Sequence, residues 1–531
     1  MNLRIDQPMT TVPIEMIALN RLAFGPSPFD LAHFQNLGLS RWLDEQMNPD
    51  ASKDEDCIYR VDHSVLRIHY PAGNGYPALD QDRPLNYLNM PIENIWHLTD
   101  NKVPMAGQER NRPRSELVCA TLLRAVYSRW QLREVMTDFW HNHFSVNGGD
   151  TPVAVALPAY DREVIRPHCF GNFRDLLEAV ASSTAMLYFL NNRSSRAGIA
   201  NENYARELFE LHGLGREHYL NEFYNRWRDV PGALKGKPVG YIDQDVYEAA
   251  RAFTGWTVED GSGLGGSDHL PFTGKFTYVE SWHDNYQKRV LGVEFDPFQP
   301  AMSDGRKVLD LVANHPATAE YLSKKLCRRL VSDTPSPSLV SNAKDIWIKS
   351  INKPDQIKRV IDFIVHSDEF SQTWGAKVKR PLELVASYIR ATGIDFVPTE
   401  GLLGELESSG QKLFAWNSPT GHPDEKEYWL STNAMRKRWS LIMGMTDNWW
   451  KTGAFDPYLL MGNRTYSVSQ AIDFWMLRLF GTYPVPQMKS IILESLALNP
   501  DQPLDSAKSG NDKTLRHIVA YLAMSPDFQL R

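Results

Sequence analysis

The chain has 531 residues, of which 42% are hydrophobic and 23% charged, a balance typical of a globular protein with a sizeable core. Its net charge of −7 argues against nucleic acid as the main partner, because phosphate binding needs a concentrated basic face. The four cysteines lie far apart and form no CxxC pair, so neither a thiolate zinc site nor a disulfide framework is expected.

The chain contains no run of about 18 uninterrupted apolar residues, the length that a membrane-spanning helix needs. Its N-terminal residues also lack the apolar core of a signal peptide. We therefore expect no membrane span and, for the sequence as written, a protein that starts in the cytoplasm.

Helical spacing of apolar residues dominates the pattern along the chain. Residues 12–48 alternate this spacing with a Gly-Pro-Ser-Pro break, and residues 50–113 are expected to form a long ordered excursion over the surface, because they are rich in proline and glycine. Helices are then predicted over 115–140, 172–190, 202–212, 243–253, 305–330, 340–371, 379–393, 431–447, 467–479, 486–498 and 513–525.

Residues 254–300 differ from the rest of the chain. Gly-rich turns there separate short runs of Thr, Phe, Tyr and Val, which predicts one or two β-hairpins. The predicted fold is mainly α: an irregular multi-helix array with a small β-hairpin insertion near 254–300, built as a single unit over 1–531. We expect helix to exceed strand several-fold, with most strand residues inside that insertion.

Several motifs resemble those of the bacterial family called "domain of unknown function 1800". These are Phe139-Trp140-His141-Asn142-His143-Phe144, Arg166-Pro167-His168, Asn201 to Leu208 (NENYAREL), Glu210-Leu211-His212, and Tyr241 to Trp256. Later elements that are similar begin at His315, Lys377 and Trp416. The resemblance covers roughly 14–525 and implies a shared fold and site, but no reaction. Residues 216–240 insert a polar, aromatic-rich segment where relatives are short, and many relatives look exported, so the resemblance also allows export.

The predicted helix over 202–212 carries a polar face. Asn203, Arg206, Glu207 and Glu210 share that face at 100° per residue. Such a stripe is most often a solvated surface held by pairs three and four residues apart. Here it adjoins several asparagines and ends in His212, and carboxylate with imidazole suits a transition metal or acid–base chemistry.

His141 and His143 form the second half of the expected site. Two residues apart, they diverge by about 200° on a regular helix and can converge only if the helix ends near Trp140. In the structural interpretation, one of them caps the helix and the other is buried and hydrogen-bonded. In the functional one, both bind a metal together with Glu207 and His212.

Two hypotheses follow for the function. The first is a metal-dependent hydrolytic or oxidative enzyme that acts on an unknown substrate. His141, His143, Glu207 and His212 would bind Zn, Mn or Fe without cysteine, and Asn203, Arg206, Glu207 and Glu210 would act on the substrate. Supporting positions are His168, Asn192, Asn201, Glu202 and His283. The second is a non-catalytic scaffold or protein-binding module in which these polar residues form structural networks.

Overall fold

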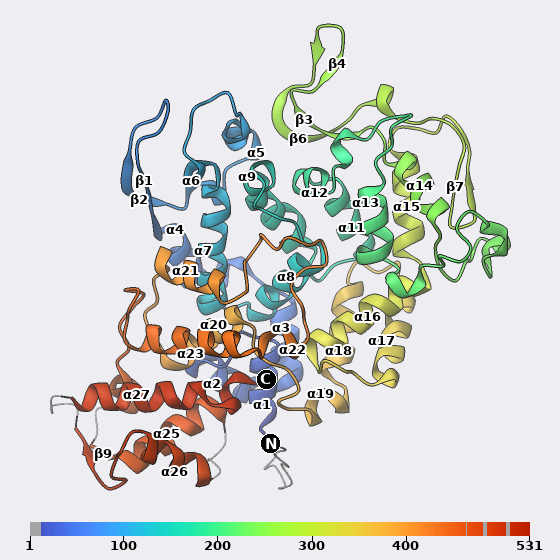
Figure 1. Ribbon diagram of the computed structural model, residues 1–531. Helices are drawn as coiled ribbons and strands as arrows, with labels where there is room; N and C mark the ends of the chain where they lie inside the picture. Colours follow the sequence, from blue (N-terminus) through green and yellow to red (C-terminus); the bar gives the residue numbers. More distant parts are fainter. Residues whose placement is uncertain (1–11, 463–464, 482–485, 506–509) are drawn as a thin grey trace.

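The computed structural model describes residues 12–462, 465–481, 486–505 and 510–531 (Figure 1). Helices make up 57% of the protein. Within the described ranges the strands pair only as small two-stranded antiparallel sheets. The prediction of a mainly α protein with small β insertions is therefore confirmed. No helix in these ranges is both long and apolar enough to cross a membrane.

The N-terminal part consists of short helices around one hairpin. Its elements are α1 (Ile14–Arg21), α2 (Pro28–Leu37), α3 (Leu39–Met47), α4 (Glu55–Asp62), β1 (Val65–Tyr70), β2 (Leu79–Pro84), α5 (Ile92–Ile95) and α6 (Gly107–Arg110). The hairpin β1–β2 lies in the predicted surface excursion over 50–113 and was not predicted. Its signal was present, because buried Leu66 and Ile68 alternate with more exposed neighbours at the two-residue period of a strand.

The central part contains two helices that were predicted as one. Its elements are α7 (Arg112–Tyr127), α8 (Gln131–His143), α9 (Thr151–Ala159), α10 (Arg166–His168), α11 (Phe173–Ala181), α12 (Thr184–Phe189), α13 (Glu202–Glu207) and α14 (Asp243–Ala252). The predicted helix over 115–140 breaks at Ser128, whose backbone is extended. Ser128 donates a hydrogen bond to Asp54, and the side chain of Gln131 donates to the carbonyl of Ser128 at 2.8 Å. Tertiary hydrogen bonds thus stabilise a break that helical periodicity does not reveal.

This central part also contains two π-helical turns. They are η4 (Tyr160–Ile165), between α9 and α10, and η6 (Leu208–His212), which continues α13. Turns of this kind are rare and frequently occur at functional sites.

The β-rich insertion lies where the Gly-bounded runs predicted strands, but it forms three antiparallel strand pairs instead of the one or two hairpins expected. Its strands are β3 (Trp256–Asp260), β4 (Gly263–Gly265), β5 (Asp268–His269), β6 (Phe272–Tyr278), β7 (Lys288–Val290) and β8 (Val293–Phe295). Strand β3 pairs with β6, with Trp256 opposite Tyr278 and a register shift between Val258 and Asp260. The β4–β5 hairpin projects from the body at the top of Figure 1.

The remainder of the chain is almost entirely helical. It contains α15 (Ser303–Ala313), α16 (Pro316–Leu330), α17 (Pro337–Lys349), α18 (Gln356–Val365), α19 (Asp368–Gln372), α20 (Pro381–Thr392), α21 (Glu400–Ser408), α22 (Lys426–Trp429), α23 (Thr432–Thr446), α24 (Pro457–Met461), α25 (Val468–Phe480), α26 (Pro486–Ser495), α27 (Asn511–Met524) and α28 (Pro526–Gln529). Strands β9 (Tyr466–Ser467) and β10 (Pro503–Leu504) pair briefly beside α25.

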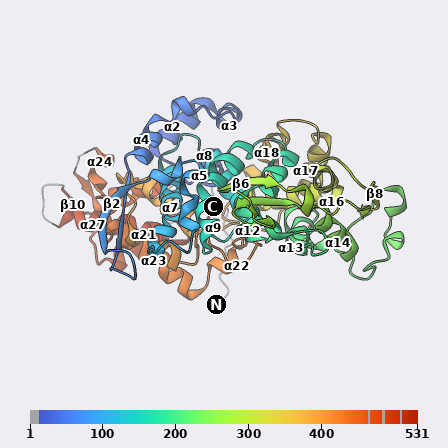
Figure 2. The same ribbon diagram turned by 90° about the horizontal axis from the view of Figure 1, so that it is seen from above.

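One continuous cluster of buried apolar residues runs from Ile17 to Phe528. Eight tryptophans are among the largest fully buried side chains, so most of the high tryptophan content serves the core. Helices α7, α8 and α9 lie centrally in both views, between α27 on one side and α14, α16 and α17 on the other (Figures 1 and 2). The 216–240 segment has a small apolar cluster of its own around Val230, Ala233 and Ile242.

Candidate functional site

The two histidines of α8 face different surroundings. The helix continues to His143, so the condition under which the two rings could converge, a helix end near Trp140, is not met. On this regular helix the rings diverge: His141 Nε2 lies 3.0 Å from Asp161 Oδ1, whereas His143 Nε2 lies 3.1 Å from the carbonyl oxygen of His212. Each histidine therefore contacts one of the two π-helical turns, because Asp161 is on η4 and His212 is on η6.

Asp161 belongs to a buried network of ion pairs. Arg166 donates to both oxygens of Glu134, at 2.9 and 2.8 Å, and its Nε donates to Asp161 at 2.7 Å. Arg124 contacts Asp161 at 3.2 Å. Burial alone would raise the pKa of Asp161, but Arg166, His141 and Arg124 outweigh burial and hold that pKa well below its usual range. Asp161 is therefore a carboxylate that accepts a hydrogen bond from His141.

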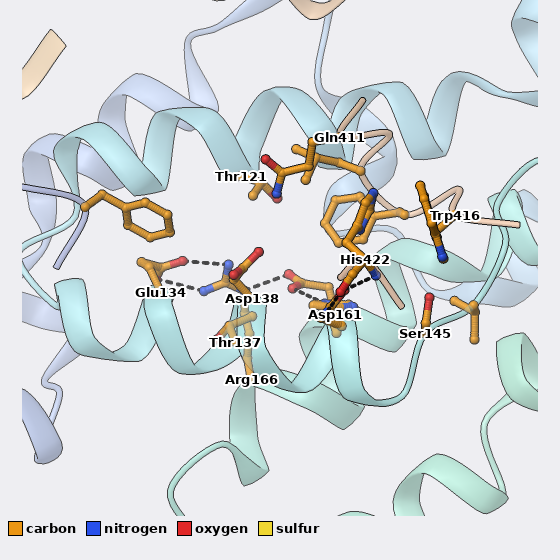
Figure 3. A pocket seen from close by; sticks show the side chains of 16 residues that line it. Thr121, Glu134, Thr137, Asp138, Ser145, Asp161, Arg166, Gln411, Trp416 and His422 are labelled. Atoms are coloured by element: carbon orange, nitrogen blue, oxygen red, sulfur yellow. Dashed lines mark hydrogen bonds and ion pairs between the residues drawn. The ribbon is translucent and has the colours of Figure 1, made fainter. Parts of the chain in front are cut away.

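A cavity of about 40 Å³ lies beside this network (Figure 3). One water molecule needs about 10–15 Å³ of such volume, so the cavity has room for about three. It is lined by Phe24, Thr121, Glu134, Thr137, Asp138, His141, Asn142, Ser145, Val146, Asp161, Arg166, Gln411, Leu413, Phe414, Trp416 and His422. The lining thus joins residues of α8, η4 and α10 to the segment 411–422, which we call the roof segment.

Two residues of the roof segment that line the cavity each carry a nitrogen with no hydrogen-bond partner within the described part of the protein. These nitrogens are Nε1 of Trp416 and Nε2 of His422, both shielded from solvent. His422 is only 8% exposed, and burial with the nearby charge of Arg380 lowers its pKa to about 4. Buried polar groups are nearly always hydrogen-bonded, so these two nitrogens are available to bind a polar guest.

Asn142 fastens the roof segment to α8. Its Oδ1 accepts from the backbone N–H of His422 at 2.7 Å, and its Nδ2 donates to the carbonyl of His422 at 3.0 Å. The neighbouring Gly421 has a φ of 73°, and a Cβ there would lie 2.1 Å from the carbonyl oxygen of Asn142. The chain approaches so closely that only glycine fits.

Replacing Gly421 by Ala should therefore lower the free energy of unfolding by about 2 kcal/mol, because the left-handed backbone and the close approach both penalise a Cβ. Gly404→Ala provides the matched control: Gly404 lies inside α21, and a Cβ there meets no atom within 4 Å. We expect the control to be neutral or slightly stabilising in urea unfolding. Equal effects of the two changes would contradict the close approach.

The other histidine of α8 belongs to a second buried group. His143 Nδ1 lies 3.0 Å from Nζ of Lys325, while neither ring nitrogen of His212 has a described partner. Burial lowers the pKa of His212 to about 3 and that of Lys325 to about 8. His212 is therefore neutral in the folded protein at neutral pH.

This burial predicts acid sensitivity. The unfolded chain binds a proton at His212 below about pH 6.5, but the folded protein does so only near pH 3. Stability contributed by neutral His212 is thus complete above pH 6.5 and declines by about 1.4 kcal/mol per pH unit as the pH falls through that window. In His212→Leu, the slope of the unfolding free energy against pH should be smaller by about this amount. The exposed His97, changed to Leu, should leave the slope unaltered; an unchanged slope in His212→Leu would disprove the burial argument.

The polar face predicted for 202–212 lies elsewhere. Glu207 is half-buried with no described partner, and burial together with the nearby Glu210 raises its pKa to about 7. Arg206 pairs with Glu202 at 3.3 Å and with Asp243 at 3.4 Å, and Asn203 is exposed. None of the described side chains of this face lines the cavity beside His141. The structure thus brings His212 to His143, but not the α13 carboxylates to His141.

The supporting positions have mainly structural contacts. His168 Nδ1 lies 2.7 Å from the carbonyl of Val164 in its own helical turn. Asn192 is buried and donates to the carbonyl of Phe253, and Asn201 caps α13. His283 is buried between the carbonyl of Thr254 and the carboxylate of Asp304.

The four residues expected to bind a metal do not assemble. Among the residues that the structure describes, no three His, Cys, Asp or Glu side chains form a group that could hold a metal ion. Both ring nitrogens of His143 have partners, one being the ammonium group of Lys325. All four cysteines are buried and free.

Most of the cavity residues were not predicted. The sequence indicates Arg166 and Trp416 only as parts of motifs, and it does not single out Asp161 or His422. Asp161 contacts a residue 20 positions away and His422 contacts one 280 positions away, so no local spacing could pair them. The one local indication of this site is the WHNHF motif, in which His141 and Asn142 directly follow Trp140.

The fold and its buried polar network define a mainly α protein with a small pocket lined by acid–base residues. The chain belongs to the family described as "Protein of unknown function (DUF1800)", whose family model matches residues 17–530. No curated protein and no solved structure matches the chain.

Proposed function

We propose that the cavity beside His141 is the active site of a hydrolytic enzyme that acts on a small polar substrate. One observation carries the proposal: His141 Nε2 is held by a carboxylate at 3.0 Å, while Nδ1 has no partner within the described residues and the ring lines a cavity. A histidine base whose other ring nitrogen is held by a carboxylate is a common arrangement for proton transfer in enzymes.

Asp161 sets the state of the His141 ring. Because Asp161 is ionised, it can only accept a hydrogen bond, so Nε2 of His141 carries the ring hydrogen and donates this hydrogen bond. In the neutral ring, Nδ1 then has a free lone pair. Nδ1 can then take a proton from an attacking water molecule and return it to the leaving group. The hydroxyl of Ser145, which lines the same cavity, is the alternative nucleophile.

A metal-dependent form of this proposal uses different ligands from those expected. Zn, Mn or Fe would bind the imidazole nitrogens that remain open here, those of His141 and His422, with water or substrate as further ligands. Elemental analysis of protein purified without a histidine tag tests this form. Metal bound in proportion to protein and lost in both His141→Ala and His422→Ala would support it, whereas metal lost in Glu207→Ala alone would favour the α13 carboxylates.

A non-catalytic scaffold is the second candidate. It is favoured by the saturation of the Arg166 network, in which Glu134 and Asp161 both have arginine partners. In that function the network would hold α8, η4 and α10 together, and the cavity would contain only water.

Hydrolysis of a panel of small chromogenic esters, amides, phosphoesters and glycosides separates the two candidates. An enzyme should turn over at least one class, and His141→Gln should lower kcat/KM by about 10²–10⁴-fold, the usual contribution of a general base. His168→Gln is the matched control, because His168 contacts only its own helical turn. Turnover that is equal in His141→Gln and the parent would refute His141 as the base, and no turnover of any class would favour the scaffold.

A further inference from the structure

Trp416 of the roof segment lines the cavity and carries a hydrogen-bond donor that has no described partner. Nε1 of Trp416 is buried without a described partner, and an indole N–H can only donate. The Trp416 ring lies against that of His422, with centroids 4.6 Å apart. Whatever occupies this end of the cavity must therefore offer an acceptor atom to Trp416.

His422 supplies the adjoining polar atom and its position is fixed. Asn142 holds the backbone of His422 on both sides, as described above, and the side chain is more than nine-tenths buried. Because its pKa is about 4, the ring is neutral at physiological pH and brings no positive charge. Its open Nε2 can donate to the same guest or accept from it.

The charges around the cavity exclude an anionic guest. Arg166 is the one Lys or Arg side chain among the described lining residues, and it is already bonded to both Glu134 and Asp161. Asp138, another lining residue, is paired with Arg329 and Arg380. A buried carboxylate or phosphate would meet no open cation, and burying an unpaired charge is costly.

We infer that Trp416 and His422 bind the oxygen of a small neutral carbonyl group, such as that of an amide or ester. The cavity of about 40 Å³ admits only a small group, and Trp416 supplies the donor that a carbonyl oxygen requires. This inference rests on the proposed function, since it names the substrate class for the base at His141. Asn142 is a positioning residue that acts through His422.

The test measures binding rather than turnover. Acetamide and acetate are added separately to the ¹⁵N-labelled full chain, and the indole N–H resonance of Trp416, assigned by its loss in Trp416→Phe, is followed. We expect acetamide to shift this resonance in a saturable way and acetate at equal concentration to shift it much less. In ligand-observed titrations, Trp416→Phe and Asn142→Ala should each weaken acetamide binding by about 3- to 10-fold, the value of one hydrogen bond.

Two controls separate this inference from the proposed function. Trp449→Phe alters an indole that is 56% exposed and should leave acetamide binding unchanged. His141→Gln removes the base and should lower hydrolysis, whereas Trp416→Phe should weaken acetamide binding, so the two variants report on different parts of the site. A shift that persists without any hydrolysis would leave the inference intact and refute the proposed function. An indole resonance that acetamide does not move, or that acetate moves equally, would overturn the inference whatever the protein hydrolyses.

Discussion

Replacing Glu383 by Gln should lower the free energy of unfolding by about 3–5 kcal/mol, the cost of breaking a buried ion pair from one side. Glu383 is 5% exposed and faces Arg329, Arg380 and Arg531. It also accepts from the backbone N–H of Arg380 at 2.7 Å. Glutamine keeps the shape of the side chain but removes the ion-pair partner of Arg531 and leaves Arg329 and Arg380 with Asp138 as their shared carboxylate.

The same change should alter the response to acid. Burial would raise the pKa of Glu383, but the three arginines outweigh burial and hold it well below its usual value. Its contribution is therefore complete above the unfolded pKa of about 4.3 and is lost as the pH falls further. Urea unfolding at pH 7 and pH 3 measures both effects. Glu407→Gln, a surface control 44% exposed in its side chain, should cost less than about 1 kcal/mol; an equal cost for the two variants would contradict the buried network.

Replacing Arg166 by Met should destabilise the protein by a comparable amount, about 3–5 kcal/mol, and should also disturb the site. The guanidinium binds Glu134 through two nitrogens and Asp161 through the third, so its loss leaves two buried carboxylates with weaker partners. The pKa of Asp161 should then rise, and the hydrogen bond between Asp161 and His141 should weaken as a result.

Arg166→Lys provides the informative comparison. Lysine keeps the charge, but a single ammonium group cannot reproduce a planar fork with three hydrogen bonds to two carboxylates. We expect Arg166→Lys to recover only part of the stability lost in Arg166→Met, as measured by thermal and urea unfolding. Full recovery would show that charge alone matters at this position, and that the geometry described here does not.

The fold was largely predictable because apolar residues recur with the helical period along amphipathic helices. Amphipathic spacing located α14, α20, α23 and α27 within a few residues, and Gly-bounded runs located the hairpins near 254–300. The break at Ser128 was not predictable, since it depends on hydrogen bonds that helical spacing does not record: Ser128 donates to Asp54 and accepts from Gln131.

The candidate site was predictable only in part. The WHNHF motif correctly pointed to the end of α8, and the divergence of His141 from His143 on a continuous helix follows from helical geometry. Which partner each ring meets depends on η4 and η6, and irregular turns of this kind carry no periodic signal. The roof segment reaches the site from 280 positions away, through Asn142 and His422, so only the folded chain reveals it.

Selective alkylation tests the central claim most directly, namely that His141 is an open base within a site for small carbonyl compounds. Bromoacetamide carries the proposed amide group, and attack by Nδ1 on its methylene carbon forms an N–C bond and releases bromide. The four cysteines should compete poorly, because burial raises the pKa of Cys119, Cys169 and Cys327 to about 12 and that of Cys57 further. Peptide mass spectrometry then gives the rate of labelling at each histidine.

We predict that His141 is labelled faster than the exposed His63 and His97, that acetamide protects His141 alone, and that Asp161→Asn slows its labelling. Labelling of His141 no faster than that of the exposed histidines, with no protection by acetamide, would contradict the assignment of this cavity as the functional site.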